Sequence, residues 1–152
     1  MQNFDPALFL QQGQKAVANA TFVPQCPPGD YQMVIDSLKA EQFPGVKDPS
    51  KTYTKVKFGL AVNDPGVQAL LKRDKVVVFH DFLLEMTEDG SGIDMGEGKN
   101  VGLGRMRAAA GLNQPGIEWN FGMFVGRPVL GHVEHEMYNG ESYAKCTKVT
   151  KV

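Results

Sequence analysis

The stretch KTYTKVKFGLAV, residues 51–62, combines basic, aromatic and apolar side chains at a spacing of two. Successive side chains of a strand point to opposite faces, so one register predicts a core face made of Thr54, Val56, Phe58, Leu60 and Val62. The other register carries Tyr53, Lys55 and Lys57, followed by Gly59 and Ala61, whose small side chains leave room for a ligand. Rings that stack on bases and lysines that meet phosphates suit the binding of single-stranded nucleic acid. These residues are therefore candidate contacts, and the alternative is that the lysines only solvate an exposed strand.

The segment KVVVFHDFLLEMT, residues 75–87, is another strand candidate that carries mixed signals. Lys75 and Phe79 share one register with Asp81 and Glu85, and the two acids would repel phosphate. Only the start of this segment therefore suits a nucleic-acid path. The opposite register is more apolar, so the face that points to the core stays open at this point.

The remaining candidate contacts lie in the second half of the chain. Arg105 and Arg107 stand two apart on a predicted helix and diverge, so one of them could reach a phosphate while a solvated helix face explains both equally well. Trp119, the only tryptophan, is either a core residue or a stacking platform. Lys145 and Lys148 make the final strand basic, either towards solvent or towards phosphate.

Catalytic and metal-binding patterns have little support in this sequence. His132 and His135 stand three apart in a predicted strand, where they point to opposite faces and make poor joint metal ligands. The glycine-rich run GEGKNVGLG lacks the spacing of a phosphate-binding loop and has no strand directly before it. We therefore expect no enzyme activity, no cofactor and no bound metal.

Length and composition are those of one globular domain. The chain has 152 residues, 42% of them hydrophobic and 22% charged, and its formal net charge is -1. That charge argues against binding a polyanion by bulk attraction alone, but a local basic patch is compatible with it. Cys26 and Cys146 are far apart and are expected to be free thiols. No run is apolar enough for a membrane span and the N-terminus lacks a secretory pattern, so a soluble cytoplasmic protein is expected.

Residues 1–29 are predicted to form an N-terminal arm. Asp5 and Pro6 suit the start of a short helix, and the prolines in VPQCPPG exclude regular structure after it. The arm is rich in apolar side chains and should pack on its own domain or on a neighbouring subunit, which would make the protein a homo-oligomer. The residues that lead to this expectation are Phe4, Leu8, Phe9, Leu10 and Phe22.

Residues 30–152 are predicted to form a mainly β domain. Strands are expected at 30–40, 51–62 and 75–87, with a loop at 41–50 and either a short helix or an extended lead-in at 67–75. A helix centred on 106–110 should follow, then a strand-like period at 117–125 that also fits a helical turn, then a hairpin around Asn139 and Gly140. A single helix between the third and fourth of five antiparallel strands suggests an OB-fold-like barrel, although a small sandwich with one helix gives a similar pattern.

Several motifs together resemble one protein family. They are FDPALFL, VPQCPPGDYQMVIDS, GLGRMRAAAGL and FVGRPVLGHVEHEMYNGESYAKCTKVTKV. The chain is similar in these places to small phage-encoded single-stranded-DNA-binding proteins with an OB fold. The resemblance implies sequence-tolerant coating of single-stranded DNA during replication or recombination in the host cytoplasm, with phage or host replication proteins as partners. Many such proteins end in an acidic tail that recruits partners, whereas this chain ends KCTKVTKV. The alternative function is a protein-interaction or virion assembly component.

Overall fold

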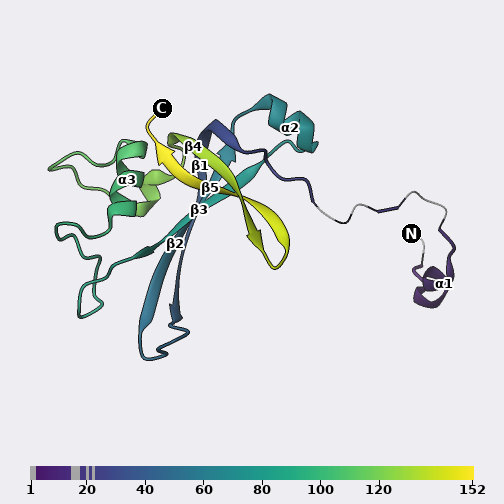
Figure 1. Cartoon of the computed structure of the whole chain (residues 1–152), viewed down its shortest axis with the longest axis horizontal. Coiled ribbons are helices and arrows are strands. Elements are labelled where there is room, and N and C mark those ends of the chain that lie inside the picture. The colour runs from purple at the N-terminus through teal and green to yellow at the C-terminus, as the bar shows by residue number, and fades with distance from the viewer. Residues whose placement is uncertain (1–2, 15–17, 20, 22) are drawn as a thin grey trace.

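The computed structural model describes residues 3–14, 18–19, 21 and 23–152. Its centre is one antiparallel five-stranded sheet in the order β3-β2-β1-β4-β5, which confirms the predicted mainly β class (Figure 1). The elements are α1 (Pro6–Gln11), β1 (Gly29–Pro44), β2 (Thr52–Val62), α2 (Pro65–Leu71), β3 (Val77–Leu84), α3 (Val101–Ala110), the 3₁₀ helix η1 (Phe121–Phe124), β4 (Pro128–Tyr138) and β5 (Glu141–Thr150).

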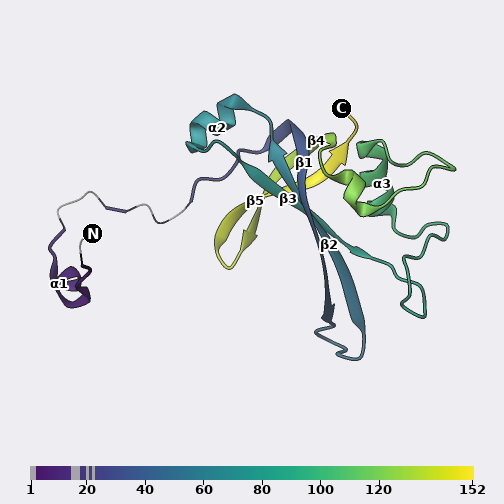
Figure 2. The same ribbon diagram turned by 180° about the vertical axis from the view of Figure 1, so that it is seen from behind.

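The long hairpin of β1 and β2 projects from the rest of the sheet (Figure 2). The predicted core register of β2 is confirmed, because Val56, Phe58, Leu60 and Val62 are all buried. The expectation of a loop from residue 41 is wrong, since β1 continues to Pro44. Cross-strand pairs hold this extension: Glu41 lies opposite Lys55, and Phe43 lies opposite Tyr53. Such pairs stabilise a sheet even where the local sequence contains turn-forming residues.

The two edge strands, β3 and β5, lie near each other, and all their residues are described. They form no ladder with each other. The Nδ1–H group of His80 on β3 donates a hydrogen bond to the carbonyl of Cys146 on β5, at 2.9 Å. Side-chain contacts therefore bridge the seam between these strands, and the sheet is not closed by backbone hydrogen bonds.

Helix α3 lies between β3 and β4 in the chain, as predicted, and packs one face on the core. Leu103, Met106, Ala109 and Ala110 are its buried residues. The buried Asn100 precedes the helix and fixes its start, because its side chain donates to the carbonyls of Glu85 and Asp94. Gly111 ends the helix with a φ of 76°, a conformation that glycine adopts at little cost.

Residues 117–125 form no strand, so the helical alternative was the better interpretation. Phe121–Phe124 is a 3₁₀ turn, and the side chain of Asn120 accepts a hydrogen bond from the Met123 amide at its start. The ring of Phe124 is fully buried and meets the ring of Phe58 edge-on at 5.1 Å. Ile117 and Val125 of the alternating set are exposed, so this segment reaches the core mainly through Phe124 of the turn, which lies outside that set.

The start of the arm folds as predicted, but it does not pack on its own domain. The Asp5 carboxylate caps α1 by accepting from the amides of Ala7 and Leu8. No residue of this helix is buried, and α1 lies apart from the sheet in Figures 1 and 2. The expectation that Phe4, Leu8 and Phe9 pack on their own domain is therefore wrong, and packing on a neighbouring subunit remains a prediction. Phe22 lies outside the described residues.

The end of the arm does contact the domain. Cys26 is buried, and its carbonyl accepts a hydrogen bond from Nε2 of His135 on β4 at 2.8 Å. The Tyr31 hydroxyl donates to the carbonyl of Pro27 at 2.8 Å. These contacts fix the chain directly before β1.

Candidate nucleic-acid interface

An exposed aromatic pair lies on the outer face of the β1–β2 hairpin. The ring of Tyr53 stacks on the ring of Phe43, with 5.9 Å between centroids and 27° between planes. The two side chains are 39% and 37% exposed. Tyr53 therefore lies on the outer face of β2, as the alternation of the sequence predicted. Phe43 was missed because it falls in the expected loop, and its position opposite Tyr53 in a longer hairpin is the signal that would have found it.

Lys57 and Phe79 form a second unit on the same face, from β2 and β3. The Lys57 ammonium lies 4.3 Å from the centroid of the Phe79 ring, in cation–π geometry. Phe79 is 44% exposed, whereas Val76 and Val78 are buried, which settles the register of β3. The sequence left this register open, and the structure turns Phe79 outward, so it remains a candidate contact.

Lys55 and Lys145 are both engaged with carboxylates. Lys55 lies 3.5 Å from Glu41 and 3.6 Å from Asp81, and Lys145 lies 3.4 Å from Asp81 and 3.5 Å from Glu136. Alternating charges therefore run across β1, β2, β3, β5 and β4. Burial pushes the pKa of Asp81 upward, but the nearby Lys145 and Lys55 outweigh this and leave that pKa lowered. Both lysines are compensated, so their charges are less available to phosphate.

The structure does not favour the roles that the sequence suggested for Lys75, as a phosphate contact, and for Gly59, as open space for a ligand. Lys75 forms an ion pair with Asp36 of β1 at 2.8 Å. Gly59 is buried, and an added Cβ there would collide with the hydroxyl of Ser37. The space above Gly59 is therefore filled by a neighbouring side chain and does not admit a ligand.

Arg107 and Trp119 contact each other. The Arg107 guanidinium lies 4.3 Å from the centre of the indole ring, and its Nε donates to the carbonyl of Leu112 at 3.1 Å. Trp119 is half-buried and packs edge-on against Phe121 and Phe124. These contacts hold the segment after α3 against the core, so both residues have a structural role.

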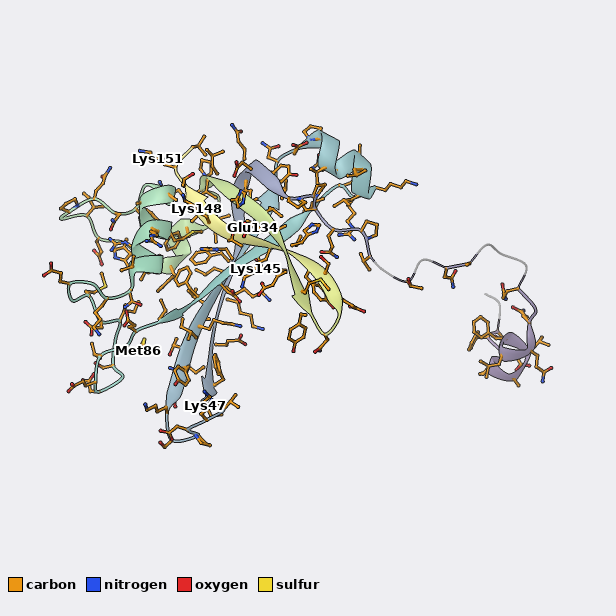
Figure 3. The ribbon with its side chains drawn as sticks, viewed as in Figure 1. Lys47, Met86, Glu134, Lys145, Lys148 and Lys151 are labelled. Atoms are coloured by element: carbon orange, nitrogen blue, oxygen red, sulfur yellow. The ribbon has the colours of Figure 1, made fainter. Side chains whose placement is uncertain are left out.

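Arg105 and Lys148 are brought together by the fold. They line one cleft between α3 and the edge strands β3 and β5, and Lys151 lines it too. Figure 3 shows Lys148 and Lys151 on the α3 side of β5, while Lys145 lies nearer the β4–β5 turn. The sequence suggested that each residue could reach a phosphate, but not that they would share a site.

The histidines and cysteines have separate surroundings. Nδ1 of His132 donates to the carboxylate of Asp30 at 2.7 Å, whereas His135 contacts the carbonyl of Cys26. Within the described ranges, no group of three His, Cys, Asp or Glu residues is placed to hold a metal ion. Both cysteines are free and buried, and burial raises the pKa of Cys146 to about 11, which makes it a weak nucleophile at neutral pH.

Comparisons with known proteins supply no family for this chain. No protein-family model matches it, and no curated protein is similar to it in sequence. Among the residues that the structure describes, no helix is long and apolar enough to cross a membrane.

Proposed function

We propose that this chain is a non-enzymatic protein that binds single-stranded DNA, with little sequence preference, on the outer face of β2 and β3. The observation that carries the proposal is the set of exposed rings on this face, Phe43, Tyr53 and Phe79, beside the ammonium of Lys57. Each base stacked on an aromatic ring contributes about 1–3 kcal/mol, and every base has a face that stacks. Such a surface suits binding that tolerates any sequence.

We further propose that the domain is an OB fold. Support comes from the strand order, from α3 between the third and fourth strands, and from the approach of β3 to β5. OB folds bind oligonucleotides on strands 2 and 3 and on the loops that follow the first and fourth strands. Here the corresponding hairpins are β1–β2, which projects in Figure 2, and β4–β5, which exposes Tyr138 and Tyr143. The proposed DNA path runs between them.

The charges favour binding in which stacking outweighs phosphate contacts. Lys55 and Lys145 are already paired, so Lys57 and the facing Lys39 are the basic residues that this face offers first. Each phosphate contact adds about 0.7 to the salt slope on single strands. We therefore expect a shallow dependence of affinity on salt. A role in phage replication or recombination, with replication proteins as partners, is part of the proposal.

The test is a titration of fluorescently labelled oligo-dT at about 50 mM and about 200 mM salt, a range over which phosphate contacts change affinity measurably. Binding is expected at the lower salt, with similar affinity for a mixed-sequence oligonucleotide and weaker affinity for a duplex of the same length. A protein that is folded by circular dichroism and binds no single strand at the lower salt would refute the proposal.

The second candidate function is protein contact, for example in virion assembly, and the exposed helix α1 favours it. Phe4, Leu8, Phe9 and Leu10 are all largely exposed, which is unusual for so many apolar residues in a short segment. They would bridge subunits in an assembly. If the wild type ignores oligo-dT, while deleting residues 1–22 converts oligomers to monomers in sedimentation, this function replaces the first.

A further inference from the structure

A cleft of about 850 Å³ lies between helix α3 and the two edge strands, away from the aromatic face. Its walls come from α3, from His80 and Phe82 of β3, and from residues 147–151 at the end of β5. Sites for small ligands typically measure about 300–1,000 Å³, so the cleft has the size of a ligand site. It exists because β3 and β5 approach without a ladder and α3 covers only part of the opening.

The rim of the cleft is basic. Arg105 of α3 lines it together with Lys148 near the end of β5 and Lys151 directly after β5. Figure 3 shows the two lysines. None of the described residues that line the cleft is acidic. Asp81 is a neighbour in the chain, but it points to the other face of β3 and pairs with Lys55 and Lys145. The positive charges on the rim therefore lack an internal counter-charge within the described residues.

Lys148 also borders a second hollow, which contains Asp30 and His132. The carboxylate of Asp30 already accepts a hydrogen bond from His132 at 2.7 Å. Among the described residues no carboxylate lies within ion-pair distance of Lys148, so its ammonium can turn to the cleft.

The floor of the cleft is apolar. Phe82, Ala109 and Val149 form it, and Phe82 is held in place by the rings of Phe58 and His80 at 5.8 Å and 5.7 Å. Thr147 and Thr150 add hydroxyl groups at the edge. An inorganic anion would make no use of this floor, and an uncharged apolar ligand would make no use of three cations.

We propose that this cleft holds one nucleotide of the bound strand, with its phosphate at Arg105, Lys148 and Lys151 and its base on the floor around Phe82. The assignment rests on the proposed function, and it adds a second contact site beyond the face of β2 and β3. A strand that crosses the aromatic face would then continue past the edge of β3 to helix α3.

The first test compares two arginine variants at different places. Arg105→Ala removes a cation from the cleft, whereas Arg73→Ala removes an exposed one from the segment after α2, a helix that lies apart from α3 in Figure 1. With oligo-dT, Arg105→Ala should lower the salt slope by about 0.7, and the double change Lys148→Ala with Lys151→Ala should lower it by about 1.4. Arg73→Ala should leave both slope and affinity unchanged.

The second test locates the ligand directly. In an amide NMR titration of the wild type, thymidine monophosphate should shift residues 102–109 and 147–151. Inorganic phosphate at the same concentration should shift them much less, because it leaves the floor empty. Equal shifts with both ligands would overturn the assignment of a base to the cleft.

The outcomes separate this inference from the function on which it rests. If oligo-dT binds, but the cleft variants behave like Arg73→Ala and thymidine monophosphate moves no cleft amide, the cleft assignment is wrong and DNA binding on β2 and β3 stands. If the wild type binds no single strand, the proposed function fails and the cleft assignment fails with it.

Discussion

The ammonium of Lys145 lies 3.4 Å from the carboxylate of Asp81, so an ion pair joins β5 to β3 where no ladder connects them. The same carboxylate lies 3.6 Å from Lys55 of β2. One acid therefore holds two of the lysines that the sequence marks as phosphate ligands. The carboxylate that would repel DNA and the two lysines that would attract it therefore neutralise one another in one cluster.

Replacing Asp81 should strengthen DNA binding while weakening the fold. In Asp81→Asn, Lys55 keeps only Glu41 and Lys145 keeps only Glu136, so both become more available to phosphates. The salt slope should therefore steepen, by at most about 1.4, and affinity at low salt should rise. Stability in urea should fall by about 1 kcal/mol, the upper range for an accessible ion pair. Asp74→Asn, which changes the net charge equally at the α2–β3 turn, is the control. An Asp81→Asn protein that is folded and binds no better than this control would place the cluster outside the DNA path.

The stacking role of Tyr53 predicts a loss of affinity without a loss of slope. Tyr53→Ala removes one ring of the stacked pair with Phe43, and a stacking contact is worth about 1–3 kcal/mol, so oligo-dT binding should weaken roughly five-fold to a hundred-fold. Tyr53→Phe keeps the ring and should bind almost as the wild type does. Equal affinities for all three proteins would exclude Tyr53 from the interface.

Local patterns in the sequence predicted most of the secondary structure. The two-residue period of β2 is reliable because burial of Val56, Phe58 and Leu60 imposes it, and the Asn139–Gly140 turn forms with φ of 51° and 80° as the dipeptide predicts. The extension of β1 to Pro44 was missed because turn signals at residues 44–45 are local. The pairs with Tyr53 and Lys55 that overrule them are made across the hairpin.

The sequence predicted the residue types of the candidate site better than their partners. Arg107 is adjacent to no tryptophan in the chain, yet its guanidinium lies on Trp119, and this pairing depends on the turn of η1. Asp81 meets Lys145 only because the first three strands bring β3 round to β5. Contacts between residues so far apart follow from the topology, which a single sequence does not specify.

Lys57 and Lys55 should differ in their effect on salt dependence. Lys57 lies over an aromatic ring, with no carboxylate within ion-pair distance among the described residues, so Lys57→Ala should lower the salt slope by about 0.7. Lys55 is already held by Glu41 and Asp81, so Lys55→Ala should lower the slope by clearly less. The measurement is oligo-dT affinity at four or more salt concentrations. The reverse order would mean that DNA displaces the carboxylates from Lys55.

Phe58 should be essential to the fold, in contrast to the outer-face residues. Its side chain is 0% exposed and contacts the rings of Phe82 and Phe124. Removing a buried aromatic ring typically costs about 3–5 kcal/mol, so Phe58→Ala should unfold the domain or lower its urea midpoint sharply. Tyr53→Ala and Lys57→Ala should keep midpoints near that of the wild type. A Phe58→Ala protein as stable as these two would contradict the assigned core register of β2.

The pair of His132 and Asp30 predicts a pH dependence with a definite sign. The hydrogen bond to Asp30 is the main reason that the pKa of His132 is raised, and Glu134, 3.4 Å from Nε2, adds to it. A group whose pKa is higher in the folded state binds its proton more tightly there, so protonation of His132 favours folding. The stabilisation is complete below the ordinary pKa of about 6.5 and is lost as the pH rises through the raised pKa of the folded state.

The wild type should therefore exceed His132→Gln in stability by more at about pH 5.5 than at about pH 8.5, two values on either side of the histidine pKa. Urea denaturation at the two pH values measures this difference. An NMR titration of the His132 ring gives the pKa directly, and Asp30→Asn should bring that pKa back towards the usual histidine range, because the main hydrogen-bond acceptor is gone. A ring that titrates in the wild type below the ordinary histidine pKa would contradict the pairing of β1 with β4 at Asp30 and His132.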